Sequence, residues 1–313
     1  MRVVIVGAGI CGLVVGRRLA DSDADVVLVD KGRSVGGRLA TRRIGDATVD
    51  HGAQFFTVRT PAFQRQVDDW VDRGLATVWS HGFTASDGHP RYVATSGMNS
   101  LAKDLATGLD VRCSTMAFGI RPGSDAVAPW QVVIDDGTVH DADAVIVTTP
   151  LPQAFALLAD SGIEFEGGLL TDYDRTIALL ATLDRPAAIP PPGGVQSPTP
   201  DIGFVADNHA KGVSSTPAIT VHASATWSEA HWDDDIDALR RALIELAGTW
   251  IGGAGVLDAQ VKKWRFATPR TPWPDPCWIA EGGSIVLAGD AFDGPRVEAA
   301  HNSGLAAAHA LSG

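Results

Sequence analysis

The chain has 313 residues, of which 45% are hydrophobic and 20% are charged, and its formal net charge is −12 at pH 7. This composition is that of an ordinary globular protein and disfavours wholesale disorder. The acidic balance argues against a nucleic acid or an anionic membrane surface as a partner.

The three cysteines, Cys11, Cys113 and Cys277, show neither a CxxC pair nor metal-ligand spacing. We therefore expect reduced, buried thiols and no metal site. The apolar N-terminus contains glycines, a single basic residue and no convincing cleavage site, and no apolar run reaches the ~18 residues that a membrane helix needs. These features predict a cytoplasmic protein without a membrane partner.

The first thirty residues read as strand, turn, helix and strand. "RVVIV" is a short β-branched run typical of a buried parallel strand, "ICGLVVGRRLA" predicts a helix, and "DVVLVD" predicts a second buried strand. This is the beginning of a βαβ unit.

Further elements follow in a mixed order. Phe63, Val67, Trp70 and Val71 are spaced for one helical face after Pro61, and residues 97–106 predict a short helix. Strands are expected in 108–113, 130–137, 143–150, 175–184, 218–227 and 284–292, with a loop or edge segment at 186–200. Residues 235–250 form the clearest amphipathic helix, and 297–311 predict a helix rich in small residues.

Gly7, Gly9 and Gly12 form a GxGxxG turn between the first strand and helix. The first glycine allows the tight turn, the second lets the backbone approach a pyrophosphate, and the third permits close helix–strand packing. Asp30, at the end of the second strand, is placed to accept hydrogen bonds from a ribose diol. The pattern predicts dinucleotide binding, and the alternative is a βα turn that binds nothing.

We therefore expect an α/β chain whose Rossmann-like dinucleotide-binding domain is assembled from discontinuous segments. These segments are 1–57, 98–153 and 264–313. Residues 58–97 and 154–263 are expected to form an α+β substrate lobe.

A second glycine pair, Gly36 and Gly37, follows Asp30 and is flanked by arginines in "KGRSVGGRLATRR". Regular βα units are expected here in an NAD dehydrogenase. The glycines and Arg38 are instead suited to bring backbone N–H groups and a guanidinium to the same pyrophosphate or near a flavin. The alternative is a surface loop with solvated arginines, which suits Arg42 and Arg43 better than Arg38.

These motifs resemble the FAD-dependent amine-oxidase-like superfamily and, within it, renalase and its bacterial relatives. The similarity is carried by "VIVGAGICG", "VVLVDKGRSVGGRLATRR", "DHGAQFFT" and "LAGDAFDGPRVEAAHNSGLAAAHAL". Shorter matches are "RYVATSGMNSLAKDLA", "VIVTTPLPQ", "VHASATWS" and "KKWRFATP". The resemblance implies a two-lobed flavoprotein.

The resemblance also assigns residues to the cofactor. Arg38, Gln54 and Phe55 match the positions close to FAD, the strand near Met116 is expected at the adenine, and Asp290 at the ribityl or phosphate region. The helix that begins near Val297 is expected to direct its N-terminus at the flavin pyrimidine, where it stabilises the negative charge of the reduced ring. The full set of expected FAD contacts is Gly7, Gly9, Ile10, Cys11, Gly12, Asp30, Lys31, Gly37, Arg38, Gln54, Phe55, Met116, Asp290, Val297 and Glu298.

Two positions depart from the pattern of the relatives. Ala300 stands where the relatives often have an aromatic or glycine-rich variation, and this C-terminal segment offers no cysteine to the flavin, so FAD is expected to be non-covalent. Ile177 stands where a tryptophan is expected in bacterial relatives, which bears on the shape of the substrate pocket.

The resemblance implies oxidation of dihydronicotinamide dinucleotides reduced at the 2 or 6 position, with dioxygen as acceptor and NAD(P)⁺ and hydrogen peroxide as products. Such a substrate is already a hydride donor, so no acid–base pair is required. His222, Trp227, Trp264 and Arg265 are the pocket candidates, all expected in strands; a tryptophan in a strand is also a common core residue. Arg91 is a weaker phosphate candidate, and His81, His89 and His231 lack metal spacing.

Two other functions remain open. The first is an amine oxidase or desaturase on the same fold. Tyr92 and Tyr173 alone disfavour a tyrosine cage around an amine, although Trp or Phe side chains could serve instead. The second is a flavin-binding regulator without turnover.

Overall fold

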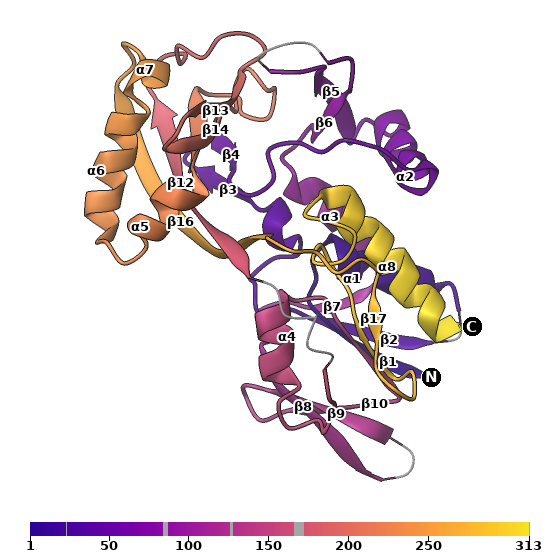
Figure 1. Cartoon of the computed structure of the whole chain (residues 1–313). Helices are drawn as coiled ribbons and strands as arrows, with labels where there is room; N and C mark the ends of the chain where they lie inside the picture. Colours follow the sequence, from indigo (N-terminus) through magenta and orange to yellow (C-terminus); the bar gives the residue numbers. More distant parts are fainter. Residues whose placement is uncertain (23, 84–86, 126–127, 166–171, 313) are drawn as a thin grey trace. The chain divides into compact units, whose positions relative to one another are not determined.

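The computed structural model describes residues 1–22, 24–83, 87–125, 128–165 and 172–312 (Figure 1). It divides into two compact units, each assembled from separated stretches of chain. Unit 1 comprises Met1–Gly37, Ala102–Asp172 and Pro269–Gly313, and unit 2 comprises Arg38–Leu101 and Tyr173–Thr268. The functional domains expected from the sequence stay a prediction, because a compact unit is defined by its packing and not by what it binds.

Unit 1 contains a six-stranded sheet in the order β17-β18-β11-β1-β2-β7. Its strands are β1 (Arg2–Val6), β2 (Asp25–Val29), β7 (Asp110–Arg112), β11 (Ala144–Val147), β17 (Trp278–Ile279) and β18 (Ile285–Leu287). All neighbours pair in parallel except β17, which is antiparallel to β18. The apolar runs of β1, β11 and β18 are buried, as in a parallel sheet covered on both faces. The expected α/β class is confirmed.

Two helices of unit 1 pack directly on each other. They are α1 (Ile10–Ala20) and α8 (Val297–Ser312). Gly304 permits the close approach, since a Cβ atom there would lie 2.6 Å from the carbonyl oxygen of Cys11. The small residues expected in the last helix therefore serve to bring its backbone against α1.

The remaining elements of unit 1 are a separate three-stranded sheet and short helices. An antiparallel meander in the order β10-β9-β8 consists of β8 (Ala117–Asp125), β9 (Ala128–Ile134) and β10 (Val139–Ala142). Helix α4 (Leu151–Leu157) begins after Pro150. Helix α3 (Asn99–Ala106) and the short 3-10 helix η1 (Gly37–Leu39) each contain residues of both units.

Unit 2 contains a five-stranded sheet in the order β13-β14-β15-β12-β16. Its strands are β12 (Tyr173–Leu183), β13 (Gly194–Thr199), β14 (Ile202–Asp207), β15 (Ala218–Ala223) and β16 (Val256–Pro269). Strand β13 is one of the two edge strands, in agreement with the edge or loop segment expected at 186–200.

Three helices accompany this sheet on one face (Figure 1). They are α5 (Ala225–Ala230), α6 (Ile236–Leu246) and α7 (Gly248–Ile251). Leu239 and Leu243 of α6 enter a core formed with Leu179 and Val221 of the sheet. The Asp235 carboxylate accepts hydrogen bonds from two first-turn amides and caps α6.

The other face of the sheet is covered by a hairpin of β3 (Thr41–Ile44) and β4 (Ala47–Asp50), which packs against β15. Ile44 and Val49 of the hairpin lie against Ala178 and Leu180 of β12. Unit 2 also contains α2 (Pro61–Asp72) and a second hairpin of β5 (Ala76–Ser80) and β6 (Arg91–Ala94).

Two expectations from the sequence are corrected by these elements. The predicted strand at 218–227 ends at Ala223, because the Ser224 hydroxyl accepts a hydrogen bond from the Trp227 amide and starts α5. Trp227 is therefore helical. In α2, Phe63 and Trp70 are buried as expected, but Val71 is 41% exposed.

Candidate functional site

The glycine turn of unit 1 lies between β1 and α1. Gly9 precedes the helix in an extended conformation (φ −74°, ψ 178°) that any residue can adopt, and a Cβ atom there would meet nothing within 4 Å. A Cβ at Gly12, in contrast, would lie 2.0 Å from the carbonyl oxygen of Gly7. Gly12 is therefore required by packing, whereas Gly9 leaves open space in front of the helix.

The start of α1 is free to bind an anion. No side chain caps this helix, and the first amides of a helix have no intrahelical partner. These amides carry the positive end of the helix dipole, which is the usual arrangement for a phosphate.

Asp30 lies beside this turn. Its Oδ2 accepts a hydrogen bond from the amide of Ala8 at 2.7 Å, and its Oδ1 accepts one from Gly32 at 2.6 Å. The amide of Thr115 donates to the Asp30 carbonyl at 2.9 Å. The carboxylate thus shapes the turn and retains lone pairs for a ribose hydroxyl. The segment that leads to Met116, which is itself in a loop and 42% exposed, runs next to Asp30.

The second glycine pair lies directly against the first turn. The amide of Gly36 donates to the Ala8 carbonyl at 2.8 Å, and Gly36 forms a parallel bridge with Gly9. Gly37 has φ +52°, and a Cβ there would lie 3.6 Å from the Cα of Gly9. The two glycine segments, distant in sequence, therefore border the same open space.

Arg38 belongs to unit 2 and is bound to β16. Its Nη1 donates to the carbonyls of Phe266 at 3.3 Å and Ala267 at 3.2 Å. Lys31 belongs to unit 1 and is exposed. The contacts of both residues with a cofactor stay predictions.

The C-terminal residues expected at the cofactor are found on unit 1. Asp290 follows Gly289, and the amide of Gly289 donates to Ser303 Oγ of α8 at 2.8 Å. Glu298 is 2% exposed in the first turn of α8. Burial raises the pKa of the Cys11 thiol, and the nearby Asp290 carboxylate raises it further. Cys11, next to Ile10 at the start of α1, is therefore a neutral thiol and not a redox thiolate.

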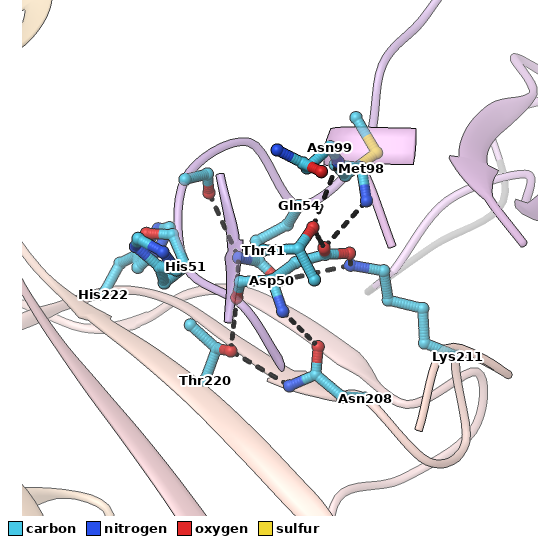
Figure 2. Close-up of polar contacts among 11 residues, drawn as sticks. Thr41, Asp50, His51, Gln54, Met98, Asn99, Asn208, Lys211, Thr220 and His222 are labelled. Carbon is cyan, nitrogen blue, oxygen red and sulfur yellow. Dashed lines mark hydrogen bonds and ion pairs between the residues drawn. The ribbon is translucent and has the colours of Figure 1, made fainter. Parts of the chain in front are cut away.

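In unit 2, a single carboxylate organises the polar side of the sheet. Figure 2 shows Asp50 at its centre. Asp50 Oδ1 accepts hydrogen bonds from Thr41 Oγ1 at 2.6 Å and the Met98 amide at 2.8 Å. Its Oδ2 forms an ion pair with Lys211 Nζ at 2.8 Å, and both side chains are completely buried. Burial lowers the pKa of Lys211, and Asp50 opposes that shift.

The backbone of Asp50 is held as firmly as its side chain. Its amide donates to Asn208 Oδ1 at 3.1 Å. Its carbonyl accepts from Gln54 Nε2 at 2.8 Å and from Thr220 Oγ1 at 2.6 Å. Asn208 Nδ2 in turn donates to Thr220 Oγ1 at 3.0 Å. The conformation of residues 50–54 is thereby fixed by β15 and by the loop that carries Asn208 and Lys211.

His51 follows Asp50 and gathers two of the expected pocket residues. Its carbonyl oxygen lies 3.2 Å from His222 Nε2 and accepts a hydrogen bond from Trp264 Nε1 at 2.8 Å. The His51 ring stacks on Trp264 with centroids 5.4 Å apart. Burial lowers the pKa values of His51 and His222 to about 4 each. Both imidazoles are therefore neutral near pH 7.

The other two pocket candidates lie elsewhere. Trp227, a residue of α5, is 9% exposed in the apolar core of unit 2 and stacks on His231. Arg265 is exposed, and as the neighbour of Trp264 in β16 it points to the opposite face. Ile177, whose identity bears on the pocket shape, is fully buried in the same apolar core. The structure thus brings His222 and Trp264 together and separates Trp227, Arg265 and Ile177 from them.

The remaining candidates have partners of other kinds. Arg91 forms an ion pair with Asp87 at 2.5 Å, with 14% of its side chain exposed. Phe55 lies against Phe83 and Phe204 with centroids 5.1 and 5.8 Å apart. Within the described ranges no group of three or more His, Cys, Asp or Glu residues is arranged to hold a metal ion.

The sequence reasoning did not find Asp50, Lys211 or His51. "DHGAQFF" contains Asp50 and His51, and its place next to the arginine segment was a signal for both. Lys211 is 161 positions from Asp50, and nothing in "NHAKG" distinguishes it from a surface lysine.

The donor set of unit 1 fits a dinucleotide. The space at Gly9 admits a phosphate that a side chain would displace, uncapped amides of α1 are directed at it, and the Asp30 carboxylate lies beside the same turn. The free cysteines supply no thiolate next to this space, since Cys11 is held neutral by burial.

Comparisons with known proteins agree with this fit. A family model described as NAD(P)-binding Rossmann-like domain matches residues 5–73, and one described as flavin containing amine oxidoreductase matches residues 70–312. Mouse renalase is 24% identical over 293 residues, covering 85% of this chain and 84% of renalase. Coproporphyrinogen III oxidase of Mycobacterium leprae is 28% identical over 195 residues, covering 59% of this chain and 40% of that protein.

Solved structures show the same fold. A provisionally assigned protoporphyrinogen oxidase from Exiguobacterium has a TM-score of 0.71 at 14% identity, covering 99% of this chain and 98% of its own. An oxidoreductase from Methanosarcina mazei has a TM-score of 0.66 at 14% identity, covering 98% of this chain and 99% of its own. Among the described residues, no helix is long and apolar enough to cross a membrane.

Proposed function

Since the chain belongs to the family of flavin-containing amine oxidoreductases, with FAD as cofactor, we propose that it oxidises 2- or 6-dihydro isomers of NAD(P)H with dioxygen. The substrate loses a hydride to become NAD(P)⁺, and dioxygen gains the two electrons and two protons, one of them from solvent, to become hydrogen peroxide. The observation that carries the proposal is the similarity to renalase across both units of the chain.

We propose that FAD is held non-covalently by the glycine turns and the flanking acids described above. Bound FAD supplies a two-electron acceptor that can deliver electrons to dioxygen. The uncapped start of α1 binds the pyrophosphate and Asp30 the adenosine ribose. Asp290 and the first turn of α8, at Val297 and Glu298, bind the flavin end of FAD.

The residues of unit 2 suit a reaction that needs positioning more than proton transfer. A dihydropyridine is a hydride donor without the help of a base. His222, His51 and Trp264 present neutral imidazole and indole groups, and the Asp50–Lys211 pair fixes the loop that carries His51. No charged acid–base pair is required of them.

An amine oxidase is disfavoured by the packing of both tyrosines. Tyr92 stacks on Phe56 with centroids 5.7 Å apart, and Tyr173 is 9% exposed against Phe266. Both rings are thus engaged in aromatic packing, which disfavours a cage of these two tyrosines around an amine. Oxidation of a porphyrinogen is a second activity to test, since the similar protein of Mycobacterium leprae is named coproporphyrinogen III oxidase.

The test is anaerobic stopped-flow absorbance of the flavin band after mixing the FAD-loaded protein with each candidate substrate. Bleaching by 2- or 6-dihydroNAD(P), with ordinary NADH and a panel of amines inactive, and recovery in air with peroxide formed, is the expected result. Bleaching by an amine or a porphyrinogen alone assigns the chain to that activity. Bleaching by none leaves a flavin-binding regulator.

The cofactor assignment has a separate test in two glycine variants. Gly9→Val places a side chain in open space and is expected to fold but to lose FAD. Gly12→Ala places a methyl group against the Gly7 carbonyl and is expected to impair folding itself. A folded Gly9→Val protein that retains stoichiometric FAD would contradict the phosphate-turn assignment; circular dichroism and the flavin-to-protein absorbance ratio distinguish these results.

A further inference from the structure

One face of β16 presents a row of functional side chains to the β3–β4 hairpin. Gln260, Lys262 and Trp264 share this face, because alternate residues of a strand point the same way. Gln260 Oε1 accepts a hydrogen bond from Arg42 Nη1 of β3 at 2.8 Å. Lys262 Nζ lies 5.2 Å from the centroid of the Trp264 ring, and Trp264 stacks on His51.

The His51 ring, which stacks on Trp264 of this row, contains a nitrogen without a hydrogen-bond partner among the described residues. The residue is 6% exposed, and its buried Nδ1 has no hydrogen-bond partner among the described residues. Buried polar atoms are nearly always paired, because leaving one unpaired costs free energy. The Nδ1 of His51 is therefore a position at which a hydrogen-bonding group of a ligand would complete the imidazole.

The charge around His51 is positive. After burial, the groups that lower its pKa most are Arg42 and Lys262, whereas the nearby carboxylate of Asp50 has only a minor opposing effect. Asp50 is already paired with Lys211. A neutral imidazole with two cations beside it is complementary to an anionic group and unfavourable for a cationic amine.

We propose that His51, Lys262 and Arg42 form an anion subsite that receives a phosphate of the dinucleotide substrate. This rests on the proposed function for the identity of the substrate. Lys262 and Arg42 neutralise the phosphate charge, and His51 Nδ1 hydrogen-bonds to the same part of the substrate. The subsite selects dinucleotides over uncharged rings and over amines.

Strand β16 offers a matched control in the adjacent lysine. Lys263 points to the other face, where its ammonium donates to the Trp232 carbonyl and lies 5.6 Å from the Trp232 ring. Lys262→Gln and Lys263→Gln therefore remove the same charge from neighbouring positions on opposite faces. Arg42→Gln and His51→Phe test the other two members of the subsite.

The experiment measures the dissociation constant of ADP-ribose by calorimetry on the FAD-loaded proteins, after their FAD content and melting temperature have been compared. ADP-ribose carries the pyrophosphate but no nicotinamide, so its binding does not depend on turnover. Lys262→Gln and Arg42→Gln are expected to weaken binding about tenfold each, and Lys263→Gln to leave it unchanged. Lys262→Gln is also expected to raise KM for the dihydro isomers about tenfold with kcat retained.

The results separate the subsite from the reaction. Equal effects of Lys262→Gln and Lys263→Gln, no effect of either, or no binding of ADP-ribose by the wild type would overturn the subsite. If the isomers are oxidised and KM is unchanged in Lys262→Gln, the proposed function stands and the subsite is ruled out. Lys262-dependent binding of ADP-ribose without oxidation of any isomer supports the subsite and removes the proposed function. His51→Phe keeps the ring stack, so a folded variant with weaker binding supports a role for Nδ1.

Discussion

The two faces of the five-stranded sheet in unit 2 are built from the same strands but differ in character: the α6 face is apolar, whereas the hairpin face combines an apolar cluster with a network of buried polar groups. Val221 of β15 lies opposite Leu179 of β12 and Val205 of β14, and all three are fully buried on the side of α6. The neighbouring residue His222 lies opposite Ala178 and Phe204 on the other side. Adjacent residues of β15 thus place an apolar side chain on one face of the sheet and an imidazole on the other.

This difference shows how the sheet combines stability with a site. The apolar face gains from burial of hydrocarbon, which is non-directional and tolerates exchange of similar shapes. The polar face is fixed by hydrogen bonds to one buried carboxylate, so each member depends on its partners. Substitutions on the two faces are therefore expected to differ in kind as well as in size.

The largest effect is expected from breaking the buried ion pair on the polar face. Lys211→Met leaves the Asp50 carboxylate buried without its cation and should lower the free energy of unfolding by about 3–5 kcal/mol. The double variant Asp50→Asn, Lys211→Met removes both charges and should recover part of this loss. Urea unfolding measures both, and a double variant less stable than Lys211→Met would contradict the assignment of the loss to the unpaired charge.

A cavity on the apolar face is expected to cost slightly less and to behave differently. Leu179→Ala removes a fully buried side chain packed against Val221 and should lower the free energy of unfolding by about 3 kcal/mol. The loss should be the same at pH 5 and pH 7, because the buried cluster around Leu179 is built from apolar side chains, whose packing does not depend on protonation. A pH-dependent loss in urea unfolding would show that the two faces are coupled.

Protonation of a histidine on the polar face gives a third, smaller effect. The pKa of His222 is lowered to about 4 from an ordinary value of 6.5. The unfolded chain therefore binds the proton first, and stability falls as pH decreases from above 6.5 towards 4. Between pH 7 and pH 5 this histidine should account for about 2 kcal/mol of the loss.

His222→Gln removes that contribution while keeping a polar side chain. Its free energy of unfolding should fall less steeply than that of the wild type between pH 7 and pH 5. Leu179→Ala serves as the control with an unchanged slope. Parallel pH profiles for His222→Gln and wild type would mean that His222 titrates normally in the folded protein.

The features that the sequence revealed are those whose residues lie close together in the chain. The glycine turn and Asp30 occupy a single βαβ unit, and α6 is marked by its helical spacing, so these were predictable. Trp227 was misplaced because the alternation of β15 continues into "SATW", where the Ser224 cap had enough strength to end the strand. The Asp50 network could not be predicted from the sequence, since its members meet only after the chain has folded: Thr41, Met98, Asn208 and Lys211.

The smallest predicted effect is that of removing one hydroxyl from the polar face. Thr220→Val keeps the shape of the side chain but loses the hydrogen bond to the Asp50 carbonyl and leaves Asn208 Nδ2 without its acceptor. The expected loss is about 1–2 kcal/mol in urea unfolding, with Thr220→Ser close to wild type because it keeps the hydroxyl. The Asp50 carbonyl still accepts from Gln54, which limits the loss. If Thr220→Val were as stable as Thr220→Ser, the hydrogen bond from Thr220 would contribute nothing to fixing residues 50–54, and the polar face would depend on its ion pair rather than on a cooperative network.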